Sequence, residues 1–280
     1  MRIGINKFQK MKNNGELIPM VTAYDYTSAV LSEQADIPLI LVGDSLGMVV
    51  MGLDSTIPVT LENMIHHTQM VVRATEKSHI VSDLPFMSYQ ISPEQAIENA
   101  GRLIKESGCQ SVKLEGGSAV KSSIKKIVDA GIPVMGHLGL TPQSINQFGG
   151  FKVQGKTTKS AQHLIDEALI VQESGAYSLV LELVPEELSK IITEKLDIPT
   201  IGIGAGKSCD GQVQVFHDLL GFEKKIIPKF VRNYAQFHVD GVSALGDFVD
   251  DVRSGSFPSE NESYCLNSET SEELGLYGAM

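Results

Sequence analysis

Several short apolar runs in this sequence are each followed at once by a polar residue or by glycine. The run Ile37 to Val42 has the length and the Ile, Leu and Val content of a strand buried on both faces, and it ends at Gly43-Asp44-Ser45. The same order recurs in HIVSD ending at Asp83, SVKLE at Glu115, VMGH at His137, LVLE at Glu182 and TIGIGAG at Gly206. Strands that each deliver a polar group at their carboxyl ends indicate one shared site.

Segments of helical periodicity separate these runs. Thr60 to Ala74 carries apolar residues on one face after a threonine N-cap, and Ser92 to Ser107 opens with Ser-Pro and is followed by glycine. The other expected helices are Tyr26–Gln34, Ala119–Ala130, Ser160–Ser174 and Pro185–Lys195. The expected strands are Leu17–Ala23, Ile37–Val42, His79–Ser82, Ser111–Glu115, Ile132–Gly136, Tyr177–Val184, Pro199–Ile203 and Gln212–Phe216. About eight strand–helix units predict an α/β fold, a closed parallel (β/α)8 TIM-type barrel in which residues 1–258 form a single domain.

Two segments lack such a pattern. Leu138 to Lys159 has no clear periodicity and contains several glycines, and a loop of that length in a compact domain is usually functional or disordered. We expect it to cover the site and limit access of water. Residues 259–280 are polar and acidic, and we expect a loosely held tail.

Charge and cysteine content exclude some classes of protein. The net charge of −11 argues against nucleic acid or an acidic membrane surface as the main partner. We find no signal peptide, and no apolar run approaches the roughly 18 residues of a membrane span. Cys109, Cys209 and Cys265 have neither metal-type nor disulfide-framework spacing. A reduced, cytoplasmic protein is the expectation.

Three carboxylates are candidates for a metal site. Asp44, Asp83 and Glu115 end the second, third and fourth expected strands, and neighbouring strands lie only about 4.8 Å apart. Carboxylates without thiolates favour a hard divalent ion, and Mg²⁺ with water and substrate completing its shell is the best match. The alternative is that some of these acids cap the helices that follow.

Other side chains of the same strand ends could act on a substrate. Lys113 points to the same side as Glu115 and suits a substrate carboxylate or keto oxygen, or else forms a salt bridge to Glu115 or Asp83. Glu182 lies in an apolar strand, where desolvation favours a general base, although a structural ion pair is the alternative. His137 either donates to a substrate or is a satisfied core histidine.

Taken together, the ordered motifs resemble the ketopantoate hydroxymethyltransferase family up to about residue 258. The stretches that carry the resemblance are MVTAYDY at 20–26, VGDSLGMVVMG at 42–52, SDLPF at 82–86, VKLEGG at 112–117, GHLGLTPQ at 136–143, LELVP at 181–185, and IGIGAG with DGQVQVFHDLLG within 201–221. The resemblance implies a (β/α)8 barrel and transfer of a hydroxymethyl group from 5,10-methylenetetrahydrofolate to 3-methyl-2-oxobutanoate, giving 2-dehydropantoate for pantothenate biosynthesis. It also implies a homo-oligomer, a decamer of two stacked rings.

The same resemblance implies roles for individual residues. Asp44 and Asp83 would bind Mg²⁺, with Glu115 completing the site directly or through water. Glu182 would be the proton acceptor. The keto acid would be bound by Ser45, Asp83 and Lys113, and also by Asp44 and His137. The residues that hold the folate co-substrate cannot be read from the sequence.

Two rival functions remain at this point. A Mg²⁺-dependent barrel of the phosphoenolpyruvate mutase and isocitrate lyase type would share the acids, but should use a reactive cysteine or a cation cluster on a mobile loop. Cys209 is the one cysteine worth testing for that role. A barrel that has lost catalysis and serves as a binding subunit would predict a broken set of acids, whereas here the set is whole.

Overall fold

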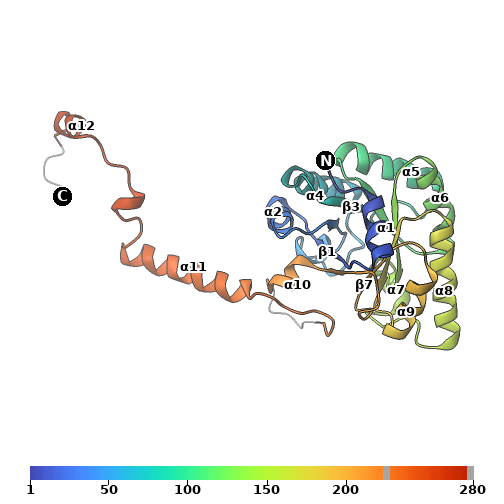
Figure 1. Cartoon of the computed structure of the whole chain (residues 1–280). Coiled ribbons are helices and arrows are strands. Elements are labelled where there is room, and N and C mark those ends of the chain that lie inside the picture. The colour runs from blue at the N-terminus through green and yellow to red at the C-terminus, as the bar shows by residue number, and fades with distance from the viewer. Residues whose placement is uncertain (223–227, 276–280) are drawn as a thin grey trace. The chain divides into compact units, whose positions relative to one another are not determined.

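The computed structural model describes residues 1–222 and 228–275, and it contains a closed barrel of parallel strands joined in chain order from β1 to β8 (Figure 1). Strand β8 pairs with β1 and closes the barrel. The strands are β1 (Ile18–Thr22), β2 (Leu39–Val42), β3 (His79–Asp83), β4 (Ser111–Glu115), β5 (Val134–Gly139), β6 (Ser178–Glu182), β7 (Thr200–Ile203) and β8 (Gly211–Gln214). The predicted (β/α)8 barrel is confirmed.

Helices connect the strands around the outside of the barrel. They are α2 (Tyr26–Gln34), α4 (Leu61–Ala74), α5 (Pro93–Arg102) with a π-helical turn at Leu103–Ser107, α6 (Lys121–Asp129), α8 (Thr158–Glu173) and α9 (Glu186–Lys195). Three of them begin at capping boxes, in which the side chain of Asp25, Thr60 or Thr157 accepts the backbone N–H of the third helical residue. These local signals explain why the sequence pattern located the helices well.

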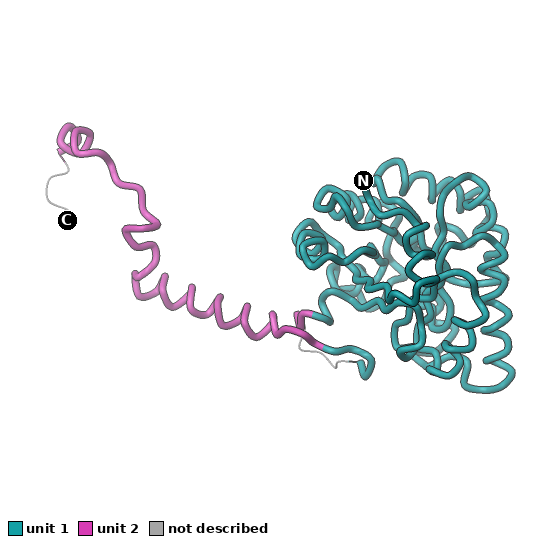
Figure 2. The backbone as a smooth tube through the Cα atoms, viewed as in Figure 1, with its two compact units in different colours: residues 1–219, 226–232 teal, residues 220–225, 233–280 magenta. Residues whose placement is uncertain are grey.

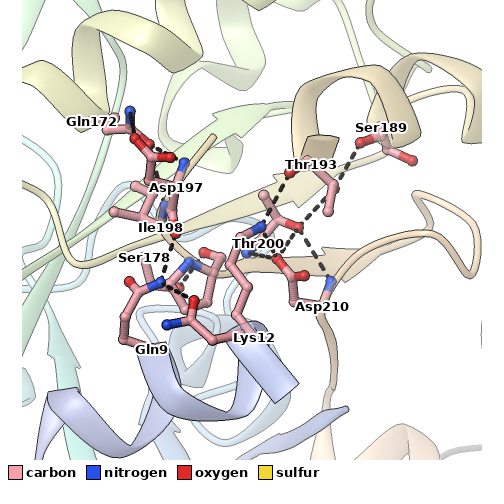
Figure 3. Close-up of polar contacts among 12 residues, drawn as sticks. Gln9, Lys12, Gln172, Ser178, Ser189, Thr193, Asp197, Ile198, Thr200 and Asp210 are labelled. Carbon is pink, nitrogen blue, oxygen red and sulfur yellow. Dashed lines mark hydrogen bonds and ion pairs between the residues drawn. The ribbon is translucent and has the colours of Figure 1, made fainter. Parts of the chain in front are cut away.

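The barrel interior is apolar near the end where the strands begin, and helix α1 (Ile5–Asn14) closes that end. Phe8 and Met11 of α1 belong to one buried cluster with inward-facing residues of the strands, such as Met20, Leu41 and Met135. Figure 3 shows the polar contacts that fix α1 there: Lys12 Nζ lies 2.8 Å from Asp210 Oδ2. With that end filled and closed, the opposite end of the barrel is where an open site can form.

The segment between β5 and α8 is more ordered in secondary structure than the sequence indicated. Strand β5 continues to Gly139, and the segment then forms a 3₁₀ turn at Pro142–Ser144 and the short helix α7 (Ile145–Phe148). The one-turn helix α3 (Leu46–Val49) after β2 was not anticipated, and the expected eighth strand ends at Gln214, since Phe216 begins α10 (Phe216–Leu220).

The chain divides into two compact units, which Figure 2 colours separately. The first is Met1–Leu219 with Ile226–Arg232 and holds the barrel; the second is Leu220–Lys225 with Asn233–Met280. This division falls earlier than the expected boundary at residue 258. The second unit contains helix α11 (Phe237–Ser254), a 3₁₀ turn at Glu260–Glu262 and helix α12 (Ser268–Glu273). Within the described ranges, none of the helices has the length and hydropathy that crossing a membrane requires.

Candidate active site at the carboxyl ends of the strands

Three carboxylates meet at the mouth of the barrel, as the sequence predicted from their places at strand ends. Asp44, Asp83 and Glu115 expose only 4%, 2% and 6% of their surface. The backbone N–H of Asp44 donates to Asp83 Oδ2 at 3.0 Å, which joins the ends of β2 and β3. Buried carboxylates without a compensating positive charge are costly, so this mouth is built to attract cations.

Lys113 supplies one positive charge to this group. It is the register partner of Asp83 on the neighbouring strand, and its Nζ lies 2.8 Å from Asp83 Oδ1. Burial lowers the pKa of Lys113, but the carboxylates of Asp83, Glu115 and Asp44 outweigh burial and raise the pKa above its ordinary value. The lysine is therefore charged at neutral pH, and the salt bridge that the sequence left open as an alternative is present.

The carboxylates still carry more negative charge than Lys113 offsets. Burial raises the pKa of Asp44, and the negative charges of Asp83 and Glu115 raise it further. The pKa of Asp83 is also raised by burial, against the opposing effect of Lys113. An additional cation beside Asp44 and Asp83 would relieve both effects.

Glu182 and His137 form the other side of the mouth. His137 Nε2 lies 3.3 Å from Glu182 Oε2, and His137 Nδ1 lies 3.4 Å from Glu115 Oε1. Burial and the nearby Lys113 lower the pKa of His137, but its interactions with the carboxylates of Glu115 and Glu182 outweigh them and raise it to about 9. The side chain of Glu182 is 14% exposed, more than those of its neighbours, so it can meet a molecule that enters the mouth.

Backbone geometry holds Glu182 at the end of its strand. The residue after it, Leu183, has a left-handed φ of 48°, which is uncommon for a residue with a side chain. Leu140 N–H donates to the carbonyl of Glu182 at 2.8 Å, and Gln154 N–H donates to that of Leu183 at 2.8 Å. The segment after β5 therefore fixes the position of Glu182, although nothing in its sequence pattern indicated this.

Ser45 is held by a residue that the sequence reasoning did not single out. The hydroxyl of Tyr24, a fully buried residue just past β1, lies 2.8 Å from Ser45 Oγ. Burial raises the pKa of Tyr24 and keeps its phenol neutral. His67 Nδ1 lies 2.6 Å from the carbonyl oxygen of Tyr24, so that histidine supports the tyrosine backbone.

Gln143 and Tyr89 were also missed. Gln143 lies in the 3₁₀ turn after β5 and is 4% exposed, yet it contacts both Asp44 and Glu115. Tyr89 lies in the loop after β3, and its hydroxyl contacts Gln143. Neither residue lies in a periodic segment; the one available signal was that Gln143 closes the motif GHLGLTPQ.

The donor set fits a divalent ion that takes part of its shell from water and substrate. Among residues 1–222 and 228–275, no three histidine, cysteine, aspartate or glutamate side chains form a set that could hold a metal ion by themselves. Mg²⁺ needs no such set, because it commonly binds through one or two carboxylates and keeps several waters. Asp44 and Asp83 are adjacent and buried, and Lys113, which pairs with Asp83, offsets only one of the negative charges around them, which is the environment such an ion requires.

Comparison with known proteins identifies the family. The family model of ketopantoate hydroxymethyltransferase matches residues 2–260. The chain belongs to this family. The chain is 56% identical over 263 residues to 3-methyl-2-oxobutanoate hydroxymethyltransferase from Chloroflexus aurantiacus, covering 94% of this chain and 93% of the relative. It is 52% identical to the enzyme of that name from Dehalococcoides mccartyi, covering 98% of each. The expected resemblance, and with it the expected enzyme class of one-carbon transferase, is confirmed.

Solved structures with similar architecture are more distant in sequence. A putative phosphonomutase from Burkholderia cenocepacia superposes with a TM-score of 0.61 at 14% identity, covering 88% of this chain and 99% of that one. A 2,3-dimethylmalate lyase of the PEP mutase/isocitrate lyase superfamily gives 0.58 at 13% identity, covering 99% of both chains. At these identities the likeness concerns the fold alone. It shows that the family shares its barrel with the superfamily considered above as a rival.

Proposed function

We propose that the chain transfers a hydroxymethyl group from 5,10-methylenetetrahydrofolate to 3-methyl-2-oxobutanoate, giving 2-dehydropantoate for pantothenate biosynthesis. Membership of the family supports the reaction. The observation that carries the mechanism is the placement of Glu182 opposite a buried group of three carboxylates and one lysine. A carboxylate at that point can take a proton from a carbon acid held by the group.

Mg²⁺ is the proposed cofactor, bound by Asp44 and Asp83, with Glu115 acting through water. The raised pKa values of both aspartates and their adjacency support this set. When bound, Mg²⁺ supplies Lewis acidity toward the keto and carboxylate oxygens of the substrate, which makes the proton on C3 more acidic. The Gln143 side chain then holds Asp44, and the Gln143 backbone N–H holds the carboxylate of Glu115.

The chain's own residues perform the proton transfer. Glu182 accepts the proton from C3 of the keto acid, and the resulting carbon nucleophile forms a bond to the methylene carbon of the folate. The carbon–nitrogen bond between that methylene group and the folate then breaks, a water molecule supplies the hydroxyl group, and tetrahydrofolate leaves. His137 Nε2 lies 3.3 Å from Glu182 Oε2, where it can donate to Glu182 or to the new hydroxyl group. Lys113, together with the Ser45 hydroxyl held by Tyr24, binds the substrate carboxylate. The low exposure of all these groups strengthens each interaction.

Exchange of the C3 proton tests this proposal. The chain is incubated in D₂O with 3-methyl-2-oxobutanoate and Mg²⁺ but no folate, and loss of the C3–H signal is followed by NMR. We expect exchange, its loss on removal of Mg²⁺, and a loss of at least about 10²-fold in Glu182→Gln. Glu187→Gln, an exposed glutamate on α9, is the matched control. Exchange that survives Glu182→Gln would contradict the proposal, and an enzyme of the mutase type should give none.

We also propose that the chain functions in the cytoplasm as a homo-oligomer, for which the family resemblance suggests ten copies. Helix α11 supports association, because none of its residues is buried although it carries apolar side chains at helical spacing. These are Val242, Leu245, Phe248, Val249 and Val252, which are between 40% and 68% exposed. A stripe of this kind is stable in water only when another surface covers it, and a second copy is the occupant we propose.

A further inference from the structure

Gln143 is the residue through which the ends of four strands are joined at the mouth of the barrel. Its side-chain Nε2 donates to Asp44 Oδ2 at 2.8 Å and to the carbonyl of Leu84 at 3.0 Å. Its backbone N–H donates to Glu115 Oε2 at 3.0 Å. Asp44, Leu84 and Glu115 belong to the ends of β2, β3 and β4, and Gln143 itself follows β5.

The orientation of the Gln143 amide is determined by its partners. The carbonyl of Leu84 can only accept a hydrogen bond, so the NH₂ group must face it. On the other side, the Tyr89 hydroxyl lies 2.7 Å from Oε1, and Gln90 Nε2 donates to the same oxygen at 3.2 Å. Both hydrogens of Nε2 and both lone pairs of Oε1 are therefore in use. The amide can present only a donor to Asp44.

Tyr89 connects the same amide to Glu115 a second time. Its hydroxyl accepts the backbone N–H of Glu115 at 3.1 Å, and its own proton is directed at Gln143 Oε1, the nearest acceptor. Tyr89 is 1% exposed, and burial raises the pKa of its phenol, so the hydroxyl remains a donor throughout the neutral range. Tyr89 thus fixes Gln143, and Gln143 fixes the two acids.

We propose that Gln143 and Tyr89 are the positioning pair that pre-orients Asp44 and Glu115 for the divalent cation. The inference rests on the Mg²⁺ site of the proposed function and adds the residues that set its geometry. The Gln143 side chain binds one oxygen of the Asp44 carboxylate, which orients the other oxygen and leaves it free of Gln143. Glu115 is held at two points: its carboxylate accepts the Gln143 backbone N–H, and its own backbone N–H donates to the Tyr89 hydroxyl. A glutamate at position 143 would instead place negative charge against Asp44 and the Leu84 carbonyl.

The chemistry of the residue type agrees with this role. Hydrogen-bond partners behind metal-binding side chains fix their orientation, and losing one typically lowers metal affinity or activity by about 10- to 100-fold. A neutral amide can donate to a carboxylate without competing for the cation as a lysine would. Gln143 is accordingly a donor beside an acid-rich site that adds no charge to it.

Metal affinity measured without substrate tests the pair directly. Mn²⁺ and Mg²⁺ binding is titrated by isothermal calorimetry and by the EPR signal of free Mn²⁺ in wild type, Gln143→Met and Tyr89→Phe. We expect Gln143→Met to weaken binding by about 10- to 100-fold and Tyr89→Phe by about 3- to 10-fold. We expect both variants to lose metal affinity even where their melting temperatures stay close to that of wild type, which a purely structural role would not produce.

Gln172→Met is the matched control. Gln172 also uses its side-chain amide to hold backbone groups, accepting from Asp197 N–H at 2.6 Å, but its contacts lie elsewhere, among the residues drawn in Figure 3. It should lower stability while leaving Mn²⁺ affinity unchanged. If Gln143→Met does not fold, Tyr89→Phe, which removes a single oxygen, decides the question.

The outcomes separate this inference from the proposed function. Wild type that binds Mn²⁺, while both variants bind it as tightly, overturns the positioning role and leaves the metal site intact. The metal site of the proposed function is overturned if wild type binds no divalent ion, or if the Asp83→Asn variant binds the ion as tightly as wild type does. Weakened binding in both variants but not in Gln172→Met supports the positioning pair.

Discussion

The ammonium group of Lys113 lies 2.8 Å from the carboxylate of Asp83, and their side chains are only 4% and 3% exposed. Such a pair is not in itself evidence of stability, since removing two charges from water costs several kcal/mol per ion. Removing either residue alone would leave the other as an uncompensated buried charge, which would destabilise the folded protein. At the mouth of this barrel the lysine therefore stabilises the buried carboxylates, in addition to the substrate-binding role proposed above.

Removing the lysine should accordingly leave a buried charge without a partner. We expect Lys113→Met to lower the free energy of unfolding by about 3–5 kcal/mol, measured by urea denaturation. Lys125→Met is the control, because Lys125 pairs with Asp129 at the surface, where both side chains are more than half exposed, and it should cost no more than about 0.5 kcal/mol. Adding Asp83→Asn to Lys113→Met should recover part of the lost stability. Equal stability of Lys113→Met and Lys125→Met would contradict this account.

A second prediction concerns acid stability and His79, at the closed end of the barrel. Its Nδ1 lies 2.8 Å from the carbonyl of Ile3 and its Nε2 lies 2.8 Å from Ser111 Oγ. Burial lowers the pKa of His79 to about 4. The unfolded chain takes up this proton near pH 6.5, so the stabilising effect of the neutral ring is complete above that pH and is lost as the pH falls toward 4.

The size of the effect follows from the shift. The difference between the His79 pKa of 6.5 in the unfolded chain and about 4 in the folded protein corresponds to about 3 kcal/mol, at about 1.36 kcal/mol per pKa unit. Between pH 7 and pH 4, wild type should lose about that much more unfolding free energy than His79→Gln, measured by urea denaturation at each pH. His163→Gln, at an exposed position on α8, should keep the wild-type pH dependence. Parallel curves for wild type and His79→Gln would refute the assignment.

Gly139 should be the glycine whose replacement most directly disturbs the proposed base. Its φ is 93°, and a Cβ there would collide with the carbonyl oxygen of Glu182 and lie 2.8 Å from Val184 Cγ2. Gly131 has a similar φ of 85°, but a Cβ there meets nothing within 4 Å. Gly131→Ala therefore isolates the backbone cost, about 1 kcal/mol, whereas Gly139→Ala adds the collision and should cost about 3 kcal/mol or more.

Activity separates the two glycines further. Displacing the backbone of Glu182 by a fraction of an ångström should lower the rate of C3 proton exchange by about 10²-fold in Gly139→Ala. Gly131→Ala should exchange at the wild-type rate, because Gly131 lies between α6 and β5, at the other end of the strand. Equal exchange rates in the two variants would show that Glu182 does not need this backbone position.

The sequence was sufficient for the barrel and for the charged part of the site because both depend on local patterns. Strand and helix periodicity locates the elements, and parallel strands bring the residues at their carboxyl ends together, which is why Asp44, Asp83 and Glu115 could be grouped. Gln143 and Tyr89 could not be found this way. Gln143 contacts Asp44 across 99 positions of sequence, from a turn without periodicity. Their roles depend on how loops fold over the mouth, which no local pattern encodes.

Helix α11 gives the last prediction, on assembly. Leu245 and Val249 are four positions apart on one face of α11 and are 68% and 40% exposed. If copies of the chain cover this face, Leu245→Glu should place a charge in the contact and shift the protein to smaller species in analytical ultracentrifugation, with the far-UV circular dichroism unchanged. Asp247→Lys, an exposed charge change on the same helix, should leave the sedimentation unchanged. A wild-type protein that sediments as a monomer, or a Leu245→Glu protein of unchanged size, would rule out α11 as the contact between copies.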